Sequence, residues 1–113
     1  MVGAKVIEAV NFFKTSLESN GIRINDLILF GSSNTGTHHP GSDIDIAVIS
    51  DDFSGMDIFT RALSTKDAEL ITIRKYRIAL DIITLTTAEY NDRNSLFLNN
   101  IRKGFPVHSA QSA

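Results

Sequence analysis

The sequence predicts an α/β fold in which helices flank a small β-sheet. Three observations lead to this expectation: apolar residues at helical spacing near the start, short apolar runs of strand length further along, and alternation between the two kinds of segment. The chain has 113 residues, of which 42% are hydrophobic, and this fits a single domain over residues 1–113. We expect residues 109–113 to form a disordered tail.

The first helix is expected over residues 2–17. Asn20-Gly21 is expected to end it, because glycine accepts the left-handed backbone conformation found at helix ends. The apolar residues of this segment recur every three or four positions and so share one helix face: Val2, Val6, Ile7, Val10, Phe13 and Leu17.

Two strands and a loop are expected next. Residues 27–30, LILF, form a short apolar run that predicts a strand buried on both faces. Residues 31–42, GSSNTGTHHPGS, predict a loop with one helical turn near its start. Residues 43–49 then alternate as DIDIAVI. On a strand, Asp43 and Asp45 share one face, and the other face carries Ile44, Ile46 and Val48.

The middle of the chain is expected to be helical. Residues 54–57 can cap a helix that carries Met56, Phe59 and Leu63, and residues 65–75 are expected to form a second helical stretch. A basic stretch before Asp81 is expected to form a solvated face or to steer a triphosphate or an acidic partner: Lys66, Arg74, Lys75 and Arg77.

The last third of the chain is expected to add a strand, two helices and a short final strand. Residues 78–85 predict a buried strand interrupted by one carboxylate, Asp81. Thr86-x-x-Glu89 is a capping-box pattern that opens a helix. We expect another helix over residues 95–102 and a short strand at residues 105–108.

Composition excludes several function classes. The chain has no cysteine, which rules out disulfides, thiolate zinc sites and cysteine nucleophiles. Its net charge of −2 gives no basic footprint for bulk nucleic-acid binding. No apolar run approaches the roughly 20 residues that span a bilayer, and the first residues do not resemble a signal peptide. We therefore expect a soluble cytoplasmic protein without a membrane partner.

Two carboxylates on an apolar strand are the most informative feature. Asp43 and Asp45 would repel each other by about 4 kcal/mol at ~4 Å in a medium of effective dielectric 20, so they need compensation. Mg²⁺ supplies it, because carboxylate oxygens are the ligands it prefers. Asp81 would complete a three-carboxylate metal site if its strand were a neighbour. In the alternative interpretation, the pair faces water and Asp81 reaches the sheet edge or pairs with Arg77.

The loop before these aspartates fits the same interpretation. Small residues at Gly31 and Ser32 let backbone N–H groups approach a phosphate, and the Ser32 hydroxyl can add a hydrogen bond. A helical turn beginning near Ser32 would add partial positive charge, although Ser32 could instead serve only as a helix cap. A phosphate-binding loop beside a metal site is a common arrangement for holding a nucleoside triphosphate.

These residues resemble a known family. Gly31-Ser32, Gly36 and Ser42-Asp43-x-Asp45 resemble the G-S-x-x-x-G…S-D-x-D signature of the nucleotidyltransferase superfamily related to DNA polymerase β. The short chain is similar to the minimal nucleotidyltransferases, over about residues 25–108. The resemblance implies a polymerase-β-like fold, with a small mixed sheet flanked by helices.

The resemblance also implies roles for individual residues. Asp43, Asp45 and Asp81 would bind two Mg²⁺ ions, and Asp81 would help to deprotonate the attacking hydroxyl. Gly31, Ser32, Gly36 and Ser42 would bind the nucleotide, which is ATP or another nucleoside triphosphate. The implied reaction transfers a nucleoside monophosphate, most simply AMP, to an acceptor hydroxyl and releases pyrophosphate.

Two departures from the family pattern stand in the loop. Thr35 occupies a position where many minimal members carry a basic residue, which weakens the case for tight phosphate binding. His38 and His39 stand where acidic or polar residues are common. They could serve as metal ligands or lie exposed in the loop.

The size of the chain suggests a protein partner. Minimal members are often encoded beside a HEPN-type toxin, and some transfer AMP to a tyrosine of that partner. An alternative is a non-catalytic antitoxin or regulatory module that binds a nucleotide and acts on its partner by contact. A third interpretation is transfer to a small molecule such as an aminoglycoside. Formation of a homo-oligomer stays open.

Overall fold

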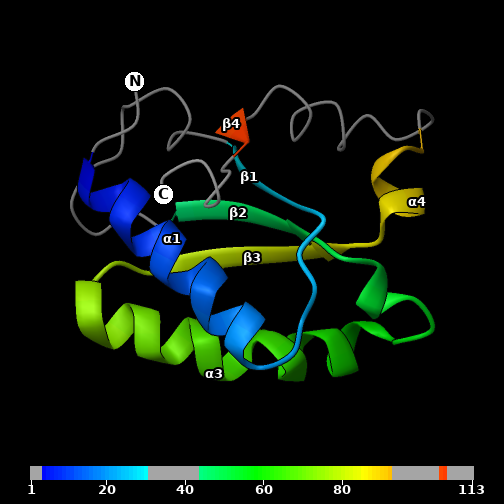
Figure 1. Ribbon diagram of the computed structural model, residues 1–113, viewed down its shortest axis with the longest axis horizontal. Coiled ribbons are helices and arrows are strands. Elements are labelled where there is room, and N and C mark those ends of the chain that lie inside the picture. Colours follow the sequence, from blue (N-terminus) through cyan, green and yellow to red (C-terminus); the bar gives the residue numbers. More distant parts are fainter. Residues whose placement is uncertain (1–3, 31–43, 93–104, 107–113) are drawn as a thin grey trace.

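The computed structural model of the protein, shown in Figure 1, describes residues 4–30, 44–92 and 105–106. Its described strands form one mixed sheet in the order β3-β2-β1-β4. Strand β2 runs parallel to β3, whereas β1 is antiparallel to both β2 and β4. The elements are α1 (Ala4–Ser19), β1 (Asp26–Phe30), β2 (Ile44–Ile49), the 3-10 turn η1 (Asp51–Phe53), α3 (Ile58–Tyr76), β3 (Leu80–Leu85), α4 (Thr87–Tyr90) and β4 (Phe105–Pro106).

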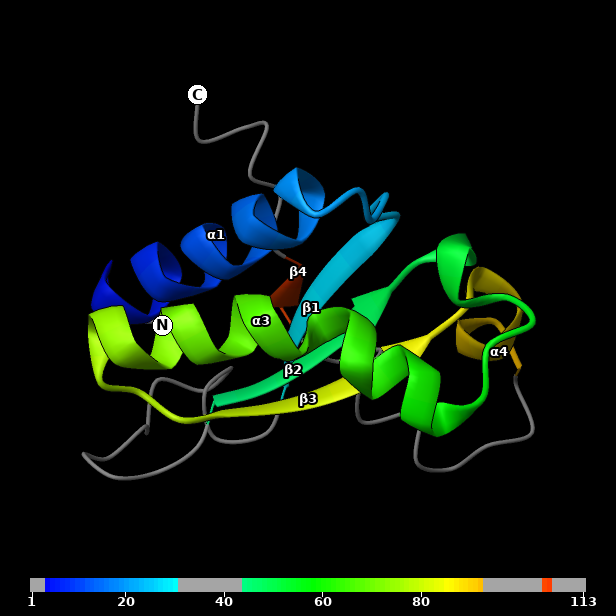
Figure 2. The same ribbon diagram turned by 90° about the horizontal axis from the view of Figure 1, so that it is seen from below.

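The two long helices pack together on one face of the sheet (Figure 2). The expected first helix is confirmed as α1, which buries Val6, Val10, Phe13 and Leu17 in the main core. It ends before Gly21, whose φ of 91° is the left-handed conformation expected there. In the part of the chain that the structure describes, no helix combines the length and apolarity needed to cross a membrane.

Strands β1 and β2 are buried on both faces. Leu27 and Leu29 of β1 face the helices, whereas Ile28 and Phe30 belong to a second apolar cluster on the opposite face. The same alternation holds in β2, as the sequence predicts. Ile44, Ile46 and Val48 lie in the helix-side core, and Ala47 and Ile49 lie in the second cluster.

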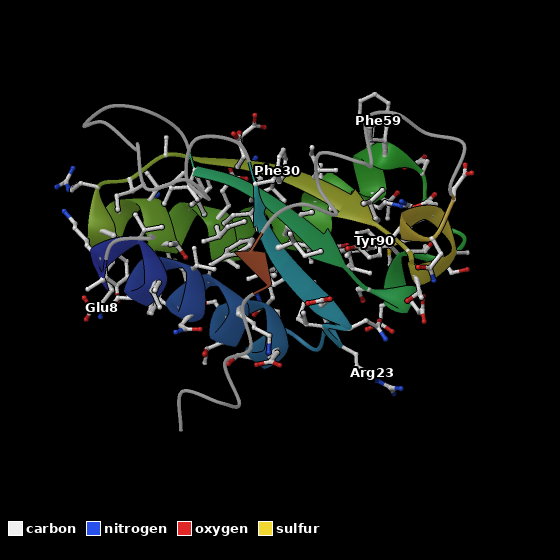
Figure 3. All side chains as sticks on the ribbon, turned by 90° about the horizontal axis from the view of Figure 1, so that it is seen from above. Glu8, Arg23, Phe30, Phe59 and Tyr90 are labelled. Atoms are coloured by element: carbon white, nitrogen blue, oxygen red, sulfur yellow. The ribbon has the colours of Figure 1, made fainter. Side chains whose placement is uncertain are left out.

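Helix α3 differs from the expectation of two helical stretches. It is one continuous helix over Ile58–Tyr76, capped by Asp57, whose Oδ1 accepts a hydrogen bond of 2.8 Å from Thr60 N. Met56 lies before the helix, and Phe59 and Leu63 are 77% and 70% exposed. The side chain of Phe59 projects outward in Figure 3. The buried positions of α3 are instead small: Thr65, Ala68 and Thr72.

Strand β3 also differs from expectation, because it lies at the edge of the sheet. Leu80 is 6% exposed, but Asp81 is exposed and the remaining residues are only partly buried. An edge strand has a neighbour on one side only, so an apolar run of this length need not be covered completely. The predicted strand and its interruption at Asp81 are therefore confirmed, but within β3 the predicted burial of the apolar residues holds only for Leu80.

The end of the described chain agrees with the sequence. Thr86 and Glu89 form the predicted capping box at α4: Thr86 Oγ1 accepts from Glu89 N at 3.1 Å, and Glu89 Oε1 accepts from Thr86 N at 2.8 Å. The expected final strand is present as Phe105–Pro106, paired with β1. The helix predicted at residues 95–102, residues 107–108 and the tail lie outside the described residues.

Candidate functional site

A row of three residues crosses the sheet where β2 and β3 begin. Asp45 of β2 pairs in register with Phe30 of β1 on one side and with Asp81 of β3 on the other. Adjacent strands lie roughly 4.8 Å apart, and side chains in register point to the same face. The two aspartates are therefore neighbours, although they are 36 positions apart in the sequence.

This pair lies on the face of the sheet that is turned away from α1 and α3. Leu80 and Ile82, which flank Asp81, pack on the helix-side core, so Asp81 itself takes the opposite face. Asp45 alternates with Ile44 and Ile46 in the same way. Asp45 is partly buried and Asp81 is exposed. The core thus fills one face, and the opposite face presents two carboxylates together.

The two residues that flank the connection between β1 and β2 lie beside this pair. Phe30, labelled in Figure 3, is the last residue of β1. It pairs in register with Asp45, and Ile44 begins β2. The segment between Phe30 and Ile44, residues 31–43, lies outside the described residues. It holds Gly31, Ser32, Thr35, Gly36, His38, His39, Ser42 and Asp43, so their predicted roles stay predictions.

The donor set at the row fits a divalent cation. Two carboxylates on adjacent strands offer four oxygen atoms, and oxygen atoms are the ligands that Mg²⁺ takes. Within residues 4–30, 44–92 and 105–106, no group of three acidic or histidine side chains could hold a metal. The third predicted ligand, Asp43, precedes β2 directly, in the connecting segment.

Glu69 of α3 is a further acidic residue of this region that the sequence motifs do not mark. Burial raises the pKa of its carboxyl group, the charge of Asp81 raises it further, and Lys66 partly opposes the change. Helical periodicity could have found it, because Glu69 follows the buried Thr65 by one turn. The carboxylates of Glu69 and Asp81 are thus close enough to affect each other.

A groove of about 690 Å³ runs along the outer edge of β3, beneath the first part of α3. Asp81 and Glu69 line it, as do apolar side chains from both elements and, among the remaining lining residues, Arg61 and Glu89. The full lining is Met56, Ile58, Arg61, Ala62, Thr65, Glu69, Leu80, Asp81, Ile82, Ile83, Thr84 and Glu89.

Arg61 and Glu89 form a bidentate ion pair. Arg61 Nη1 and Nη2 donate to the two carboxylate oxygens of Glu89 at 2.7 and 3.2 Å. The hydrogen bond from Arg61 is the main reason why the pKa of Glu89 is lowered. Arg61 Nη1 also reaches the carbonyl of Thr84 at 3.4 Å, so this pair connects α3, β3 and α4. Two of the three carboxylates that line the groove, Glu69 and Glu89, therefore have pKa values shifted in opposite directions.

A mixed sheet that presents carboxylates on neighbouring strands, beside a glycine- and serine-rich connection, is a layout suited to phosphate chemistry. Residues 10–106 match the nucleotidyltransferase domain family, and the chain belongs to that family. The general reaction of the family is the transfer of a nucleotidyl group. The family identified from the sequence motif is thus confirmed.

One solved structure supports the fold independently. A protein from Sulfolobus solfataricus that is assigned as a nucleotidyltransferase superposes with a TM-score of 0.55 at 17% sequence identity. The match covers 88% of this chain and 77% of that chain. At this identity the likeness shows the fold alone, and it confirms the predicted class of small mixed sheet with flanking helices. None of the curated proteins matches the sequence significantly.

Proposed function

We propose that this protein is a Mg²⁺-dependent nucleotidyltransferase that transfers AMP from ATP to a hydroxyl group of a partner protein. The observation that carries the proposal is the register of Asp45 and Asp81 on adjacent strands in a member of the nucleotidyltransferase family. Two like charges at this spacing repel each other, and a divalent cation offsets that repulsion.

Three aspartates would hold the metal. Asp43, Asp45 and Asp81 are the proposed ligands of two Mg²⁺ ions, which when bound neutralise phosphate charge. Gly31, Ser32, Gly36 and Ser42 are the proposed contacts to the nucleotide. All of these contacts except Asp45 and Asp81 belong to the connecting segment, whose two flanking residues lie beside the aspartate pair.

The transfer step exchanges one bond to the α-phosphorus for another. The acceptor oxygen forms a bond to the α-phosphorus of ATP while the bond from that phosphorus to the bridging β-phosphate oxygen breaks. Pyrophosphate leaves, and the hydroxyl proton passes to the carboxylate of Asp81 and then to water. Asp81 suits this role because it is exposed at the sheet edge, where an acceptor can approach, whereas Asp45 is flanked on both sides.

The acceptor is proposed to be a tyrosine of a HEPN-type partner protein. Large apolar side chains of α3, among them Phe59 and Leu63, are exposed, as is typical of a surface that contacts another polypeptide. A second polypeptide would then supply both the acceptor and part of the recognition surface. The site would act in the cytoplasm, where ATP and Mg²⁺ are available.

A second candidate is a binding module that keeps the fold and acts by contact alone. Thr35, which stands where minimal members usually carry a basic residue, favours this candidate because one phosphate contact would be lost. The two candidates differ in whether the partner protein becomes covalently modified.

The deciding experiment is mass spectrometry of a co-purified HEPN-type partner after incubation with ATP and Mg²⁺. We expect the partner to gain the mass of one AMP on a tyrosine with the native protein, and at least roughly 100-fold slower with Asp45→Asn, since direct metal ligands matter more than their outer neighbours. Asp67→Asn, which removes an exposed carboxylate of α3, is the matched control and should transfer normally.

Two results would contradict the proposal. Undiminished transfer by Asp45→Asn would show that the aspartate pair is not the metal site. A stable complex that neutralises the partner without any AMP transfer would favour the binding module.

A further inference from the structure

The outer edge of β3 carries backbone groups that no described strand uses. Its ladder with β2 engages alternate residues, as shown by the bonds from Ile44 N to Ala79 O and from Ser50 N to Leu85 O, both 2.8 Å. Backbone groups of intervening residues point the other way. Leu80, Ile82 and Thr84 therefore direct their N–H and C=O groups away from β2, along the groove.

Only part of this edge is covered. Arg61 Nη1 donates to the carbonyl of Thr84, which closes the end of the edge near α4. Among the described residues, the backbone N–H and C=O groups of Leu80 and Ile82 have no hydrogen-bond partner. Exposed edges in other proteins are commonly protected by charged residues, bulges or a covering element. Within residues 4–30, 44–92 and 105–106, a short stretch beside Asp81 is left open.

The groove beside this stretch has an acidic end and an apolar middle. Glu69 and Asp81 line one end, and burial and the charge of Asp81 raise the pKa of Glu69 more than Lys66 lowers it. Ile58 and Ala62 of α3 line the part nearer the Arg61–Glu89 pair, and Ile58 is 73% exposed. A large apolar side chain that is so exposed beside a groove is typical of a surface that contacts another molecule.

A strand added to this edge would meet the candidate site directly. Its residue in register with Asp81 would lie roughly 4.8 Å away and would point to the same face as Asp81 and Asp45. The residues before and after it would point to the other face, toward α3. Backbone pairing would thus bring one side chain to the aspartates and place its neighbours in the groove.

We propose that the free edge of β3 binds the acceptor as an extended polypeptide segment, which pairs with Leu80 and Ile82 and places a hydroxyl-bearing residue beside Asp81. The groove then selects the flanking residues, with a basic side chain facing Glu69 and an apolar side chain over Ile58 and Ala62. This inference rests on the proposed function, because it assigns the acceptor of that reaction to a surface.

The test begins with peptides in place of the partner. Short random peptides with one central tyrosine are displayed on phage and selected on the full-length protein, and the best binder is synthesised. Its affinity is measured without nucleotide, together with amide hydrogen exchange of the protein. We expect new protection at the N–H groups of Leu80 and Ile82, whereas the ladder N–H groups of Asp81 and Ile83 should be protected already.

Two adjacent positions of α3 supply matched variants. Ala62→Trp places a large side chain in the groove and should weaken peptide binding about tenfold or more, whereas Leu63→Trp, on the outward side of the helix, should leave it unchanged. Ala62 and Leu63 are both exposed, so neither change disturbs the core. N-methylation of the peptide residues whose N–H groups pair with β3 should abolish binding. N-methylation of the residues between them, whose N–H groups point away from β3, should not.

Several outcomes would overturn the inference. These are selection of no peptide, protection elsewhere on the protein, or equal effects of the two tryptophan variants. Protection of Leu80 and Ile82 that grows with protein concentration in the absence of peptide would assign the edge to a second copy of the chain. The rise in Tm caused by Mg²⁺-ATP reports on the proposed function separately. If that rise is present and peptide binding fails, only the acceptor surface is wrong.

Discussion

Strands β2 and β3 each carry an aspartate at their second position, but they lie in different environments. β2 has a strand on either side and apolar residues buried on both faces, whereas β3 has one neighbouring strand in the described sheet and is only half covered. The same residue type is therefore partly buried on β2 and exposed on β3. We infer a division of roles in which Asp45 mainly holds the metal and Asp81 mainly meets the acceptor.

The largest expected effect is a difference in stability between a substitution in β2 and the matching substitution in β3. Ile46 is completely buried and pairs in register with Ile82, which is only partly buried. Ile46→Ala should reduce the free energy of unfolding by about 2–5 kcal/mol, because it leaves a cavity in the core, and Ile82→Ala should cost less than half as much. Urea unfolding of the two variants measures both. Equal losses would contradict the description of β3 as a weakly covered edge.

The next prediction distinguishes Asp45 from Asp81 by the rise in Tm that Mg²⁺-ATP causes. In Asp45→Asn the rise in Tm caused by Mg²⁺-ATP should disappear, while the metal-free Tm should not fall, because a repulsion is removed. In Asp81→Asn part of that rise should remain although AMP transfer is lost. Differential scanning fluorimetry with and without Mg²⁺-ATP gives both values. An undiminished rise in Asp45→Asn would refute the shared metal site.

A smaller effect concerns the acidic end of the groove. The pKa of Glu69 is raised in the folded protein, so its ionised form destabilises the fold at neutral pH, and this cost vanishes as the pH falls below the ordinary value of 4.5. Glu69→Gln should therefore raise Tm slightly at pH 7 and leave it unchanged near pH 3. In an Asp81→Asn background the gain at pH 7 should shrink, since one cause of the raised pKa is gone. A gain that persists in acid would contradict this assignment.

The smallest expected effect concerns Glu89, which lines the groove at the end away from Glu69 and Asp81. The pKa of Glu89 is lowered, so its contribution to stability is present above the ordinary value of 4.5 and is lost as the pH falls through the lowered folded value. Glu89 is 46% exposed, and solvent screening limits the contribution to below about 1 kcal/mol. Glu89→Gln should thus lower Tm modestly at pH 7 and have no effect in strong acid. For comparison, Lys14→Gln removes the i,i+4 ion pair with Glu18, in which the side chains of Lys14 and Glu18 are 12% and 45% exposed.

The two faces of β1 and β2 could be predicted from the sequence because alternation of side chains is a local property. The order Asp-Ile-Asp-Ile and the run Leu-Ile-Leu-Phe specify which side chains share a face before any partner strand is known. The capping box at Thr86 and Glu89 is local in the same sense. The aspartate motif and its glycine- and serine-rich loop identified the family correctly.

What could not be predicted depends on contacts between distant segments. The sequence of β3 has four apolar residues of six and that of β2 has five, a difference too small to show which strand lies at the edge of the sheet. The register of Asp45 with Asp81 depends on how α3 returns the chain to the sheet. The outward position of Phe59 and Leu63 was hidden because α3 buries small residues such as Ala68 and Thr72, which single-sequence patterns do not mark as core.

The length of α3 has a consequence for the order in which the molecule assembles. Phe30 and Asp45 are close in sequence, so their pairing requires a short loop closure, whereas Asp81 must wait until the whole 19-residue helix has been made and folded back. During synthesis, a chain that has emerged only as far as α3 carries Asp45 without its neighbour. The proposed metal site is thereby completed late, so the ability to use ATP would arise only in a protein whose sheet is closed.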